Sequence, residues 1–449
     1  MERRSPWVLL TFTLLWFGAC TPTAPPGPGV SQPIGHQLTY DPTARVNGGR
    51  PLTLTFWTQT NQLQLYQGLV EGYRRIHPEI RIVLVASSYQ DHFDKLRAAL
   101  GSGIGPDLFH MHNEFAETLG PWLAPYPGDQ LPVDRLEADF TGVDSHLIEG
   151  RVTGIDTGLM TSAIFYDKEV WNRAGLGEKD IPRTWNQLRI LARRLTVLGP
   201  DGRVLRAGFD PNGMGTSLLL ALDLQQNQPL FDPRDGRHPR VNTPATHRSL
   251  EFLKSLYQDP AVVDAQVPPF HEALGSGRAA MVYAWGWAQG WLAEHYPSRQ
   301  IGTFPVPTWD GRAPAAYDRQ NGECSLGVNK NSPPDRQKVA FDVIRYFLAD
   351  DHYLADLCRD LSLIPTKRSL IHDPSLPWLG TVDRTVWPGP LPDFYERTLD
   401  ETLVDPVVID HRGVDSCLEK TQESLDRQFE TSTFRSMEGL YRYAGEFQP

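Results

Sequence analysis

Cysteine is scarce in this chain, which has only 4 among its 449 residues. Cys324, Cys358 and Cys417 lie too far apart in the sequence for a typical metal site, and their odd number leaves at least one of them without an intramolecular partner. The spacing does not decide whether two of them form a disulfide. We expect buried free thiols, because an unpaired cysteine behaves as a small hydrophobic side chain.

Positive charge is also in deficit. The chain has 43 lysines and arginines but 54 aspartates and glutamates, which gives a formal net charge of −11. A nucleic-acid partner needs clustered lysine and arginine to neutralise phosphates, so this class of partner is excluded. The deficit argues less strongly against anionic ligands, because a site can be locally basic on an acidic protein. Neutral or cationic ligands fit the charge better.

The motifs of common enzymes are missing. The chain has no Gly-x-Ser-x-Gly elbow and no phosphate loop that ends in Gly-Lys-Ser/Thr. His110-x-His112-x-Glu114 places three metal-ligating residue types on one strand face, as in a metal-dependent hydrolase, but no second set of ligands accompanies them. We therefore predict no catalytic residue, no metal and no other cofactor. A carbohydrate-active hydrolase stays open as the alternative, because a pair of catalytic carboxylates cannot be identified among so many acidic residues.

No segment after residue 20 is long and apolar enough to span a membrane. Before it, Arg3-Arg4 and an apolar run from Trp7 to Phe17 form the pattern of a secretory signal. The run ends in Gly18-Ala19-Cys20, which resembles a bacterial lipobox, so we predict a signal peptide over residues 1–20 and lipidation of Cys20. The alternative is cleavage after Ala19 with a free Cys20, because Phe17 replaces the usual leucine.

Residues 21–49 are rich in proline, glycine, serine and threonine, with five prolines between Pro22 and Pro33. Such a segment buries too little apolar area to offset the entropy of ordering it. We predict a semi-extended tether between the lipid and a folded body that begins at residue 50.

The folded body opens with a β-α-β-α-β alternation. Residues 52–58 alternate apolar and polar side chains as a strand does, and further strands are predicted over 80–86 and 107–111, with helices over 62–76 and 93–100. This order predicts a parallel sheet covered by helices. Ligands bind beyond the carboxyl ends of the strands in such sheets. The residues that follow these strands, Gln59, Asn61 and 112–115, are therefore candidate binding residues.

A second cycle of elements follows residue 152. Strands are predicted over 162–166, 279–283, 301–304 and 325–328, and helices over 168–174, 185–198, 218–225, 249–257 and 337–348. No repeat of fixed period appears.

Several short blocks resemble, in the same order, the extracellular solute-binding proteins of the sugar-binding type. The blocks are Tyr73-x-x-x-His77-Pro78-x-Ile80, Gly103-x-Gly105-Pro106-Asp107-Leu108, Tyr166-Asp167-Lys168 followed by Ala174-Gly175-Leu176 and Pro182-x-Thr184-Trp185, Gly277-Arg278-Ala279-Ala280-Met281 followed by Trp285-Gly286-Trp287, Asn329-Lys330-Asn331-Ser332, and Ile364-Pro365-Thr366. Each block alone is weak, but together they cover residues 50 to 370. The remainder of the chain matches only loosely.

The resemblance implies an α/β fold of the type II periplasmic-binding-protein kind, with a ligand cleft between two lobes. The first lobe would contain residues 50–153 and 307–365, and the second lobe residues 154–306 and 366–449, with hinges near Thr153, Pro305 and Pro365. It further implies a monomer, anchored by lipid on the outer face of the cell membrane, that captures a carbohydrate and delivers it to the transmembrane subunits of an ABC permease. A solute sensor that uses the same fold without transport is a second alternative, and some relatives bind polyols or glycerol phosphodiesters.

The resemblance also suggests binding residues, which fit a sugar because aromatic plates cover its apolar ring face and polar side chains bind its hydroxyls. Most have a structural alternative: Trp57 and Trp285 could pack in the core, Asn61 could cap a helix, Glu114 could sit at a helix N-terminus, and Asp210 could form an Asp-Pro turn. The full set of candidate ligand contacts is Trp57, Gln59, Asn61, Asn113, Glu114, Asp210, Trp285, Trp287, Arg319 and Glu323.

Overall fold

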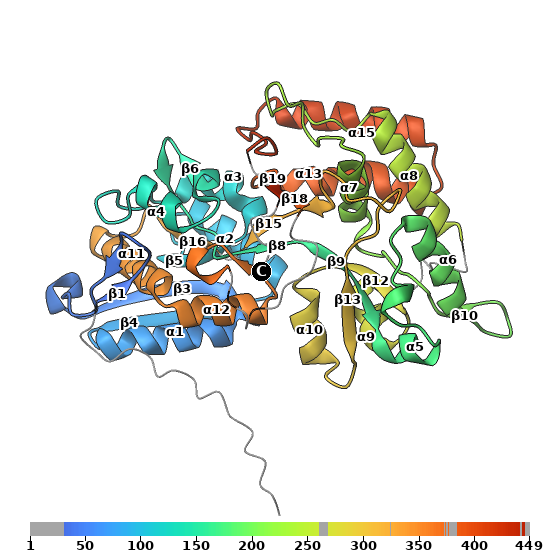
Figure 1. The fold of residues 1–449 in the computed structure, drawn as a ribbon. Coiled ribbons are helices and arrows are strands. Elements are labelled where there is room, and N and C mark those ends of the chain that lie inside the picture. The colour runs from blue at the N-terminus through green and yellow to red at the C-terminus, as the bar shows by residue number, and fades with distance from the viewer. Residues whose placement is uncertain are drawn as a thin grey trace, which may run out of the picture.

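The computed structural model describes residues 31–259, 268–323, 325–371, 373, 376, 384–440 and 442–444. The predicted signal peptide, Cys20, residues 21–30 of the predicted tether, and Cys324 lie outside these residues. Figure 1 shows two α/β bodies joined by strands that cross between them. We call the body that contains β3 the first lobe and the body that contains β9 the second lobe. The predicted two-lobed α/β fold is thus confirmed.

A four-stranded sheet in the order β16-β5-β3-β4 forms the centre of the first lobe. Its strands are β3 (Leu52–Gln59), β4 (Ile80–Ser87), β5 (Leu108–Met111) and β16 (Ser325–Val328). As the alternation predicts, β3 is parallel to both β4 and β5, whereas β16 is antiparallel to β5. Because β4 and β5 flank β3 on opposite sides, right-handed connections place the two intervening helices on opposite faces.

Those two helices pack into separate apolar clusters. Helix α1 (Leu63–Ile76) buries Tyr66, Leu69 and Tyr73 in the main core, and α2 (Tyr89–Gly101) buries Phe93, Leu96 and Leu100 in a smaller one. The other regular elements of the first lobe are β1 (Gln32–Pro33), β2 (Thr39–Tyr40), α3 (Ala116–Leu119), α4 (Val133–Asp139), β6 (Leu147–Ile148), β7 (Arg151–Val152), α11 (Pro334–Ala349) and α12 (Asp351–Asp360).

The second lobe contains an antiparallel sheet in the order β12-β9-β13. Its strands are β9 (Ser162–Asp167), β12 (Met281–Trp285) and β13 (Ile301–Phe304). The remaining elements are α5 (Lys168–Arg173), α6 (Trp185–Leu195), β10 (Val197–Leu198), β11 (Val204–Arg206), α7 (Gly215–Gln225), α8 (Pro244–Tyr257), α9 (Phe270–Ser276), α10 (Ala288–His295), β14 (Asp318–Arg319), β18 (Arg384–Val386), α13 (Asp393–Leu399), α14 (Asp405–Val408), α15 (Val414–Phe429) and β19 (Arg442–Ala444).

Two short strands connect the lobes, and a third strand pairs beside them. β8 (Gly158–Met160) leads into β9, and β15 (Asn321–Glu323) leads from β14 back to β16. β17 (Ile364–Pro365) follows α12, and the residues after it still bond to the first lobe, Thr366 to the amide of Thr141 and Lys367 to the carbonyl oxygen of Leu348. The three strands form a sheet in the order β15-β8-β17, which we call the crossing sheet.

The crossing sheet differs from the predicted hinges. The crossings at β8 and β15 come later in the chain than Thr153 and Pro305, and the residue after Pro365 still bonds to the first lobe. Residues 307–320 contact the second lobe. Thr308 forms a parallel β-bridge with Thr184, and the rings of Trp309 and Phe252 of α8 form a T-shaped pair with centroids 5.2 Å apart. Burial of this aromatic ring holds the segment on the second lobe, and we propose the return crossing at β15.

The predicted tether is wrong for residues 31–49. In this stretch Ile34, Leu38, Tyr40 and Val46 are buried in the core of the first lobe. The Tyr40 hydroxyl lies 2.8 Å from Nε2 of the buried His77. A few apolar side chains spaced along a proline- and glycine-rich segment are enough to dock it, so the folded body begins before residue 50.

Cys358 and Cys417 are buried free thiols, as predicted for the cysteines of the body. Burial raises the pKa of the Cys358 thiol well above its usual range, which keeps it protonated and unreactive. Among the residues that the structure describes, no helix combines the length and the apolar character needed to cross a membrane.

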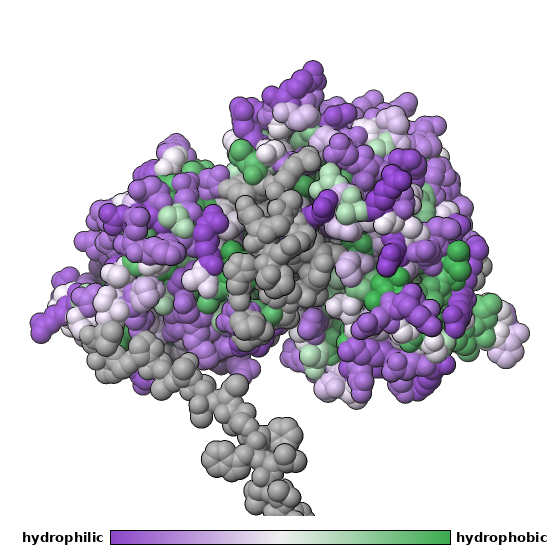
Figure 2. Space-filling view, in the orientation of Figure 1, coloured by the Kyte–Doolittle hydropathy of each residue, from purple (hydrophilic) through white to green (hydrophobic). Residues whose placement is uncertain are grey.

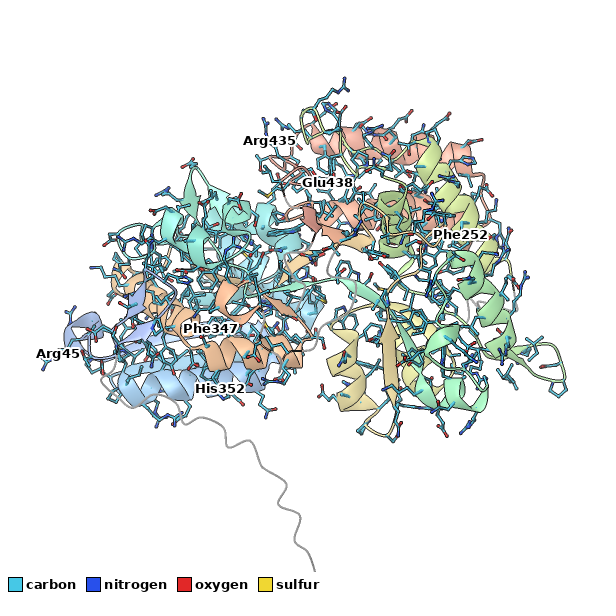
Figure 3. All side chains as sticks on the ribbon, in the orientation of Figure 1. Arg45, Phe252, Phe347, His352, Arg435 and Glu438 are labelled. Carbon is cyan, nitrogen blue, oxygen red and sulfur yellow. The ribbon has the colours of Figure 1, made fainter. Side chains whose placement is uncertain are left out.

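Replacing Ile34 with alanine tests whether the N-terminal segment belongs to the body. Because Ile34 is completely buried, Ile34→Ala should lower the free energy of unfolding by about 2–5 kcal/mol in urea titrations. The control is Arg45→Ala, which changes an exposed residue at the far end of the same segment (Figure 3) and should stay within about 0.5 kcal/mol of the wild type. Equal stability of both variants would mean that the segment is a tether.

Candidate ligand-binding site

The candidate site begins where the parallel strands of the first lobe end. β3, β4 and β5 all point their carboxyl ends toward the same edge of the sheet, at Gln59, Ser87 and Met111. The chain turns directly from β5 into a short 3-10 helix, η3 (Asn113–Phe115), which continues into α3. A carboxylate in this first turn is favoured by the helix dipole, which accounts for Glu114.

Asn113 links this edge of the first-lobe sheet to the crossing sheet through a side-chain hydrogen bond. The side chain is only 1% exposed, and its Nδ2 donates to the carbonyl oxygen of Gly322 at 2.5 Å and to Oδ2 of Asp156 at 3.2 Å. Its Oδ1 is buried and has no hydrogen-bond partner among the described residues. A buried acceptor without a partner costs about 1–3 kcal/mol, so a water or a ligand hydroxyl is expected there.

His112 links two carboxylates beside Asn113. Its Nε2 lies 3.0 Å from Oε1 of Glu323, and its Nδ1 lies 3.7 Å from Oε1 of Glu114. Burial alone would lower the pKa of His112, but the charges of Glu323 and Glu114 outweigh it and raise the pKa to about 9. His112 is therefore a cation at neutral pH, and its Nε2 donates to Glu323.

Tyr89 covers the outer side of this group. Its hydroxyl donates to Oε1 of Glu114, and its ring packs edge-on against His112 at 5.6 Å. The surrounding protein displaces water from the phenol and, together with Glu114, Glu323 and Glu396, raises the pKa of Tyr89 well above its usual range. Since Tyr89 still has 40% of its surface exposed, it lies at a solvent-facing position of the site.

Glu396 belongs to α13 of the second lobe, where it pairs with Arg319. The Arg319 guanidinium donates from Nη1 and Nη2 to the two oxygens of Glu396, each at 2.7 Å. Nη2 also donates to Oγ of Ser217 at 3.2 Å. Because Glu396 contributes to the raised pKa of Tyr89, this second-lobe pair lies within electrostatic reach of the first-lobe group.

Trp285 is covered rather than open. The Arg319 guanidinium lies 5.0 Å from the centre of its ring, and Nε1 donates to Oγ of Ser217 at 3.2 Å. The side chain is 8% exposed, so of the two roles considered for Trp285 the structure favours packing within the lobe. Its ring holds Arg319 through a cation–π contact.

Trp287 lies beside the crossing sheet and is partly exposed. Its backbone amide lies 3.3 Å from Sδ of Met160, the last residue of β8. Its ring packs edge-on against Phe270 at 5.5 Å and His271 at 5.6 Å. Two neighbouring rings therefore hold the ring of Trp287 in place, and the residue stays partly accessible.

The other candidates occupy different environments. Trp57 packs partly buried against the smaller core cluster, Gln59 is buried, and Asn61 is exposed without capping a helix through its side chain. Asp210 is completely buried, and its Oδ1 accepts from the amide of Asn212 at 2.9 Å, as in the turn that was its structural alternative. The group around His112 thus gathers Asn113, Glu114 and Glu323, and the second-lobe group gathers Trp285 and Arg319.

Sequence reasoning missed Tyr89, Asp156, Ser217 and Glu396. Tyr89 could have been found, because it follows the carboxyl end of β4 at the same sheet edge. Glu396 could not, since it lies in the part of the chain that matches the family blocks only loosely and is 77 residues from Arg319.

Comparison with known proteins identifies relatives over most of the chain. The sequence profile of the bacterial extracellular solute-binding protein family matches residues 57–353. An arabinooligosaccharide-binding protein of Bacillus subtilis (strain 168) is 26% identical over 320 residues, which are 66% of this chain and 68% of that protein. A maltotriose-binding protein of Pyrococcus abyssi is 21% identical over 399 residues, 82% of this chain and 80% of that one.

Solved structures share the fold at low sequence identity. Maltose-bound MalE3 of T. maritima has a TM-score of 0.70 at 17% identity, covering 84% of this chain and 99% of that one. The GacH receptor of Streptomyces glaucescens, solved unliganded and with acarbose, has a TM-score of 0.70 at 20% identity, covering 85% of this chain and 99% of that one.

The raised pKa of His112 predicts a pH dependence of stability. The unfolded chain binds this proton with the ordinary histidine pKa of about 6.5, so His112 stabilises the fold fully below that pH and loses the contribution as pH rises to about 9. Glu323→Gln removes the larger of the two carboxylate charges that raise the pKa and should shrink the loss of unfolding free energy between pH 7 and pH 9. The same profile in wild type and variant, measured by urea titration, would contradict the pairing.

Proposed function

Since the chain belongs to the family of bacterial extracellular solute-binding proteins, we propose that it captures a short oligosaccharide outside the cytoplasmic membrane and delivers it to the transmembrane subunits of an ABC permease. The family is extracytoplasmic and consists of binding proteins. Two of the relatives support a carbohydrate ligand, because one is an arabinooligosaccharide-binding protein and the other a maltotriose-binding protein.

The observation that carries the proposal is the polar group at the junction of the lobes. Glu114, which accepts from the Tyr89 hydroxyl, directly follows Asn113, whose buried Oδ1 has no hydrogen-bond partner among the described residues. Across from them, Glu396 leaves 38% of its side chain exposed. Carboxylates and amide oxygens accept hydrogen bonds from hydroxyl groups, and a molecule with hydroxyls on several edges satisfies acceptors on both lobes at once.

Charge balance favours a neutral ligand over an anionic one. The protonated His112 is shared by Glu114 and Glu323, and Arg319 is engaged by Glu396, so these groups offer no cation to an incoming phosphate or carboxylate. An anion would approach three carboxylates in a partly desolvated site, where like charges repel strongly. Glycerol phosphodiesters are therefore less suitable than sugars.

Trp287 is the proposed stacking residue. The ring of Trp285 is covered by Arg319, whereas Trp287 is held by neighbouring rings and is partly exposed beside the crossing sheet. A flat ring in that position suits the apolar face of a pyranose or furanose.

A hydrolase is the alternative. Within the described parts of the chain no cluster of histidine, cysteine and carboxylate side chains fits a metal ion, and His110 is buried apart from the carboxylates that hold His112. Recovering the ligand chemically unchanged after incubation supports capture, whereas cleaved products would support the enzyme.

A thermal-shift screen tests the sugar assignment. The protein from residue 21 onward should be stabilised by about 2.7 kcal/mol at 100 times the dissociation constant of its ligand, in a panel of maltotriose, arabino-oligosaccharides, monosaccharides, polyols and glycerol phosphodiesters. Trp287→Ala should weaken binding of the best sugar at least tenfold, whereas Trp309→Ala, which alters a tryptophan packed against α8, should leave affinity intact. Stabilisation by phosphodiesters alone would overturn the sugar assignment.

We further propose that a lipid on Cys20 holds the protein at the membrane, with the residues after it as a short connection to the body. Metabolic labelling with radioactive palmitate in the native cell should label the wild type and not Cys20→Ala. The variant should also leave the membrane fraction. Equal membrane retention of unlabelled wild type and variant would contradict the anchor.

A further inference from the structure

One helical segment carries both a residue of the candidate site and a contact to the opposite lobe. It spans η3 and α3, from Asn113 to Leu119. Glu114 lies in the candidate site, and Glu117 follows three residues later, which places both carboxylates on neighbouring turns of one face. A displacement of the segment at Glu114 therefore moves Glu117 with it.

Glu117 reaches the second lobe through charged hydrogen bonds. Its Oε1 accepts from the Thr433 amide at 2.5 Å and from Oγ1 of Thr433 at 2.9 Å, and its Oε2 accepts from Oγ of Ser432 at 2.8 Å. Thr433 and Ser432 follow α15. Figure 1 shows α3 and this C-terminal part of the second lobe adjacent on the same side of the crossing sheet. Hydrogen bonds to a carboxylate are about twice as strong as neutral ones.

Ser432 and Thr433 are held in place by contacts within the second lobe that do not involve Glu117. Phe434 is buried and packs against Phe231 at 5.1 Å, and its amide donates to Oγ of Ser432 at 3.1 Å. Arg237 donates to the carbonyl oxygen of Ser432 at 2.8 Å. Glu438, labelled in Figure 3 at the end of the second lobe that faces the first, accepts from two backbone amides of that lobe. The donors to Glu117 are thus preorganised.

The lobes also touch elsewhere without charged groups: a Cβ at Gly142 of the first lobe would lie 2.3 Å from the ring of Trp387, which follows β18 of the second lobe. Gly290 of α10 lies so close to the end of α12 that a Cβ there would be 2.2 Å from the carbonyl oxygen of Asp360. This contact is one of backbone packing. The Glu117 contact is different, because separating the lobes exposes a carboxylate and three donors to water, and water can replace every bond.

We propose that Glu117 is a closure residue: it stabilises the closed arrangement of the lobes, and the segment 113–119 couples this contact to ligand binding at Glu114. The inference rests on the proposed binding function. If only the closed arrangement holds ligand with both lobes, the apparent dissociation constant equals the intrinsic constant divided by the closed fraction. Glu117 then sets affinity without touching the ligand.

The test uses the chain from residue 21 onward and two measurements. Small-angle X-ray scattering without ligand reports opening, and stopped-flow fluorescence with maltotriose reports affinity and dissociation rate. Glu117→Ala should enlarge the radius of gyration of the free protein and weaken maltotriose binding about tenfold, mainly through faster dissociation. Glu117→Gln, which keeps the shape and loses the charge, should lie between Glu117→Ala and the wild type. Glu137→Ala, an exposed glutamate on α4, should match the wild type in both measurements.

A double-mutant cycle separates the contact from a general loss of stability. Ser432→Ala with Thr433→Ala should reproduce part of the effect and add little to Glu117→Ala, because both remove the same bonds. An unchanged radius of gyration and an unchanged dissociation rate in Glu117→Ala would overturn the proposal, as would full additivity. If maltotriose fails to bind the wild type while Glu117→Ala still expands the free protein, the closure contact stands and the sugar assignment fails.

Discussion

The arrangement of both lobes depends on one buried amide. Asn113 donates from the end of β5 to the backbone of β15 and to Asp156, so the edge of the first-lobe sheet is fixed to the crossing sheet. The approach is so close that a Cβ at Gly322 would lie 1.9 Å from Oδ2 of Asp156 and 2.5 Å from Nδ2 of Asn113, so a larger residue there would displace these side chains. Because β8 pairs with β15 on one side and with β17 on the other, this contact fixes the whole crossing sheet against the first lobe.

Charge pairing then determines which groups remain for a ligand. His112 and Arg319 both pair with carboxylates, and the ring of Trp285 stacks with Arg319. Both cations and this aromatic ring are therefore engaged in contacts within the protein. An unpaired cation in a desolvated site would be costly, and pairing with a carboxylate offsets part of that cost. The groups that stay available are acceptors, notably Oδ1 of Asn113 and the exposed part of Glu396. A site of acceptors at the junction of two lobes suits hydroxyl-bearing ligands better than anions.

Prediction from sequence was accurate where local pattern and burial coincide. The alternation in residues 52–58 and the β-branched run in 80–86 give the parallel strands, and the residues after β5 proved to form the polar group. It failed where the contacts are long-range. Tyr40 docks through His77 and Asp342, which are 37 and 302 residues away, and no local pattern encodes such a partner. The lobe boundary near residue 307 was misjudged for the same reason, because the packing of Trp309 on α8 is a tertiary contact.

The two halves of the site also differ in how they can move. Around His112 the bonds run within the first lobe or to the crossing sheet, so they persist whatever the second lobe does. The pairing of Arg319 with Glu396 likewise stays within the second lobe. Opening about the crossing sheet would therefore leave both half-sites intact and change only their separation. The affinity of a ligand that contacts both half-sites then depends on how well its length matches their separation. Ligand length is therefore a determinant of specificity, as well as hydroxyl chemistry.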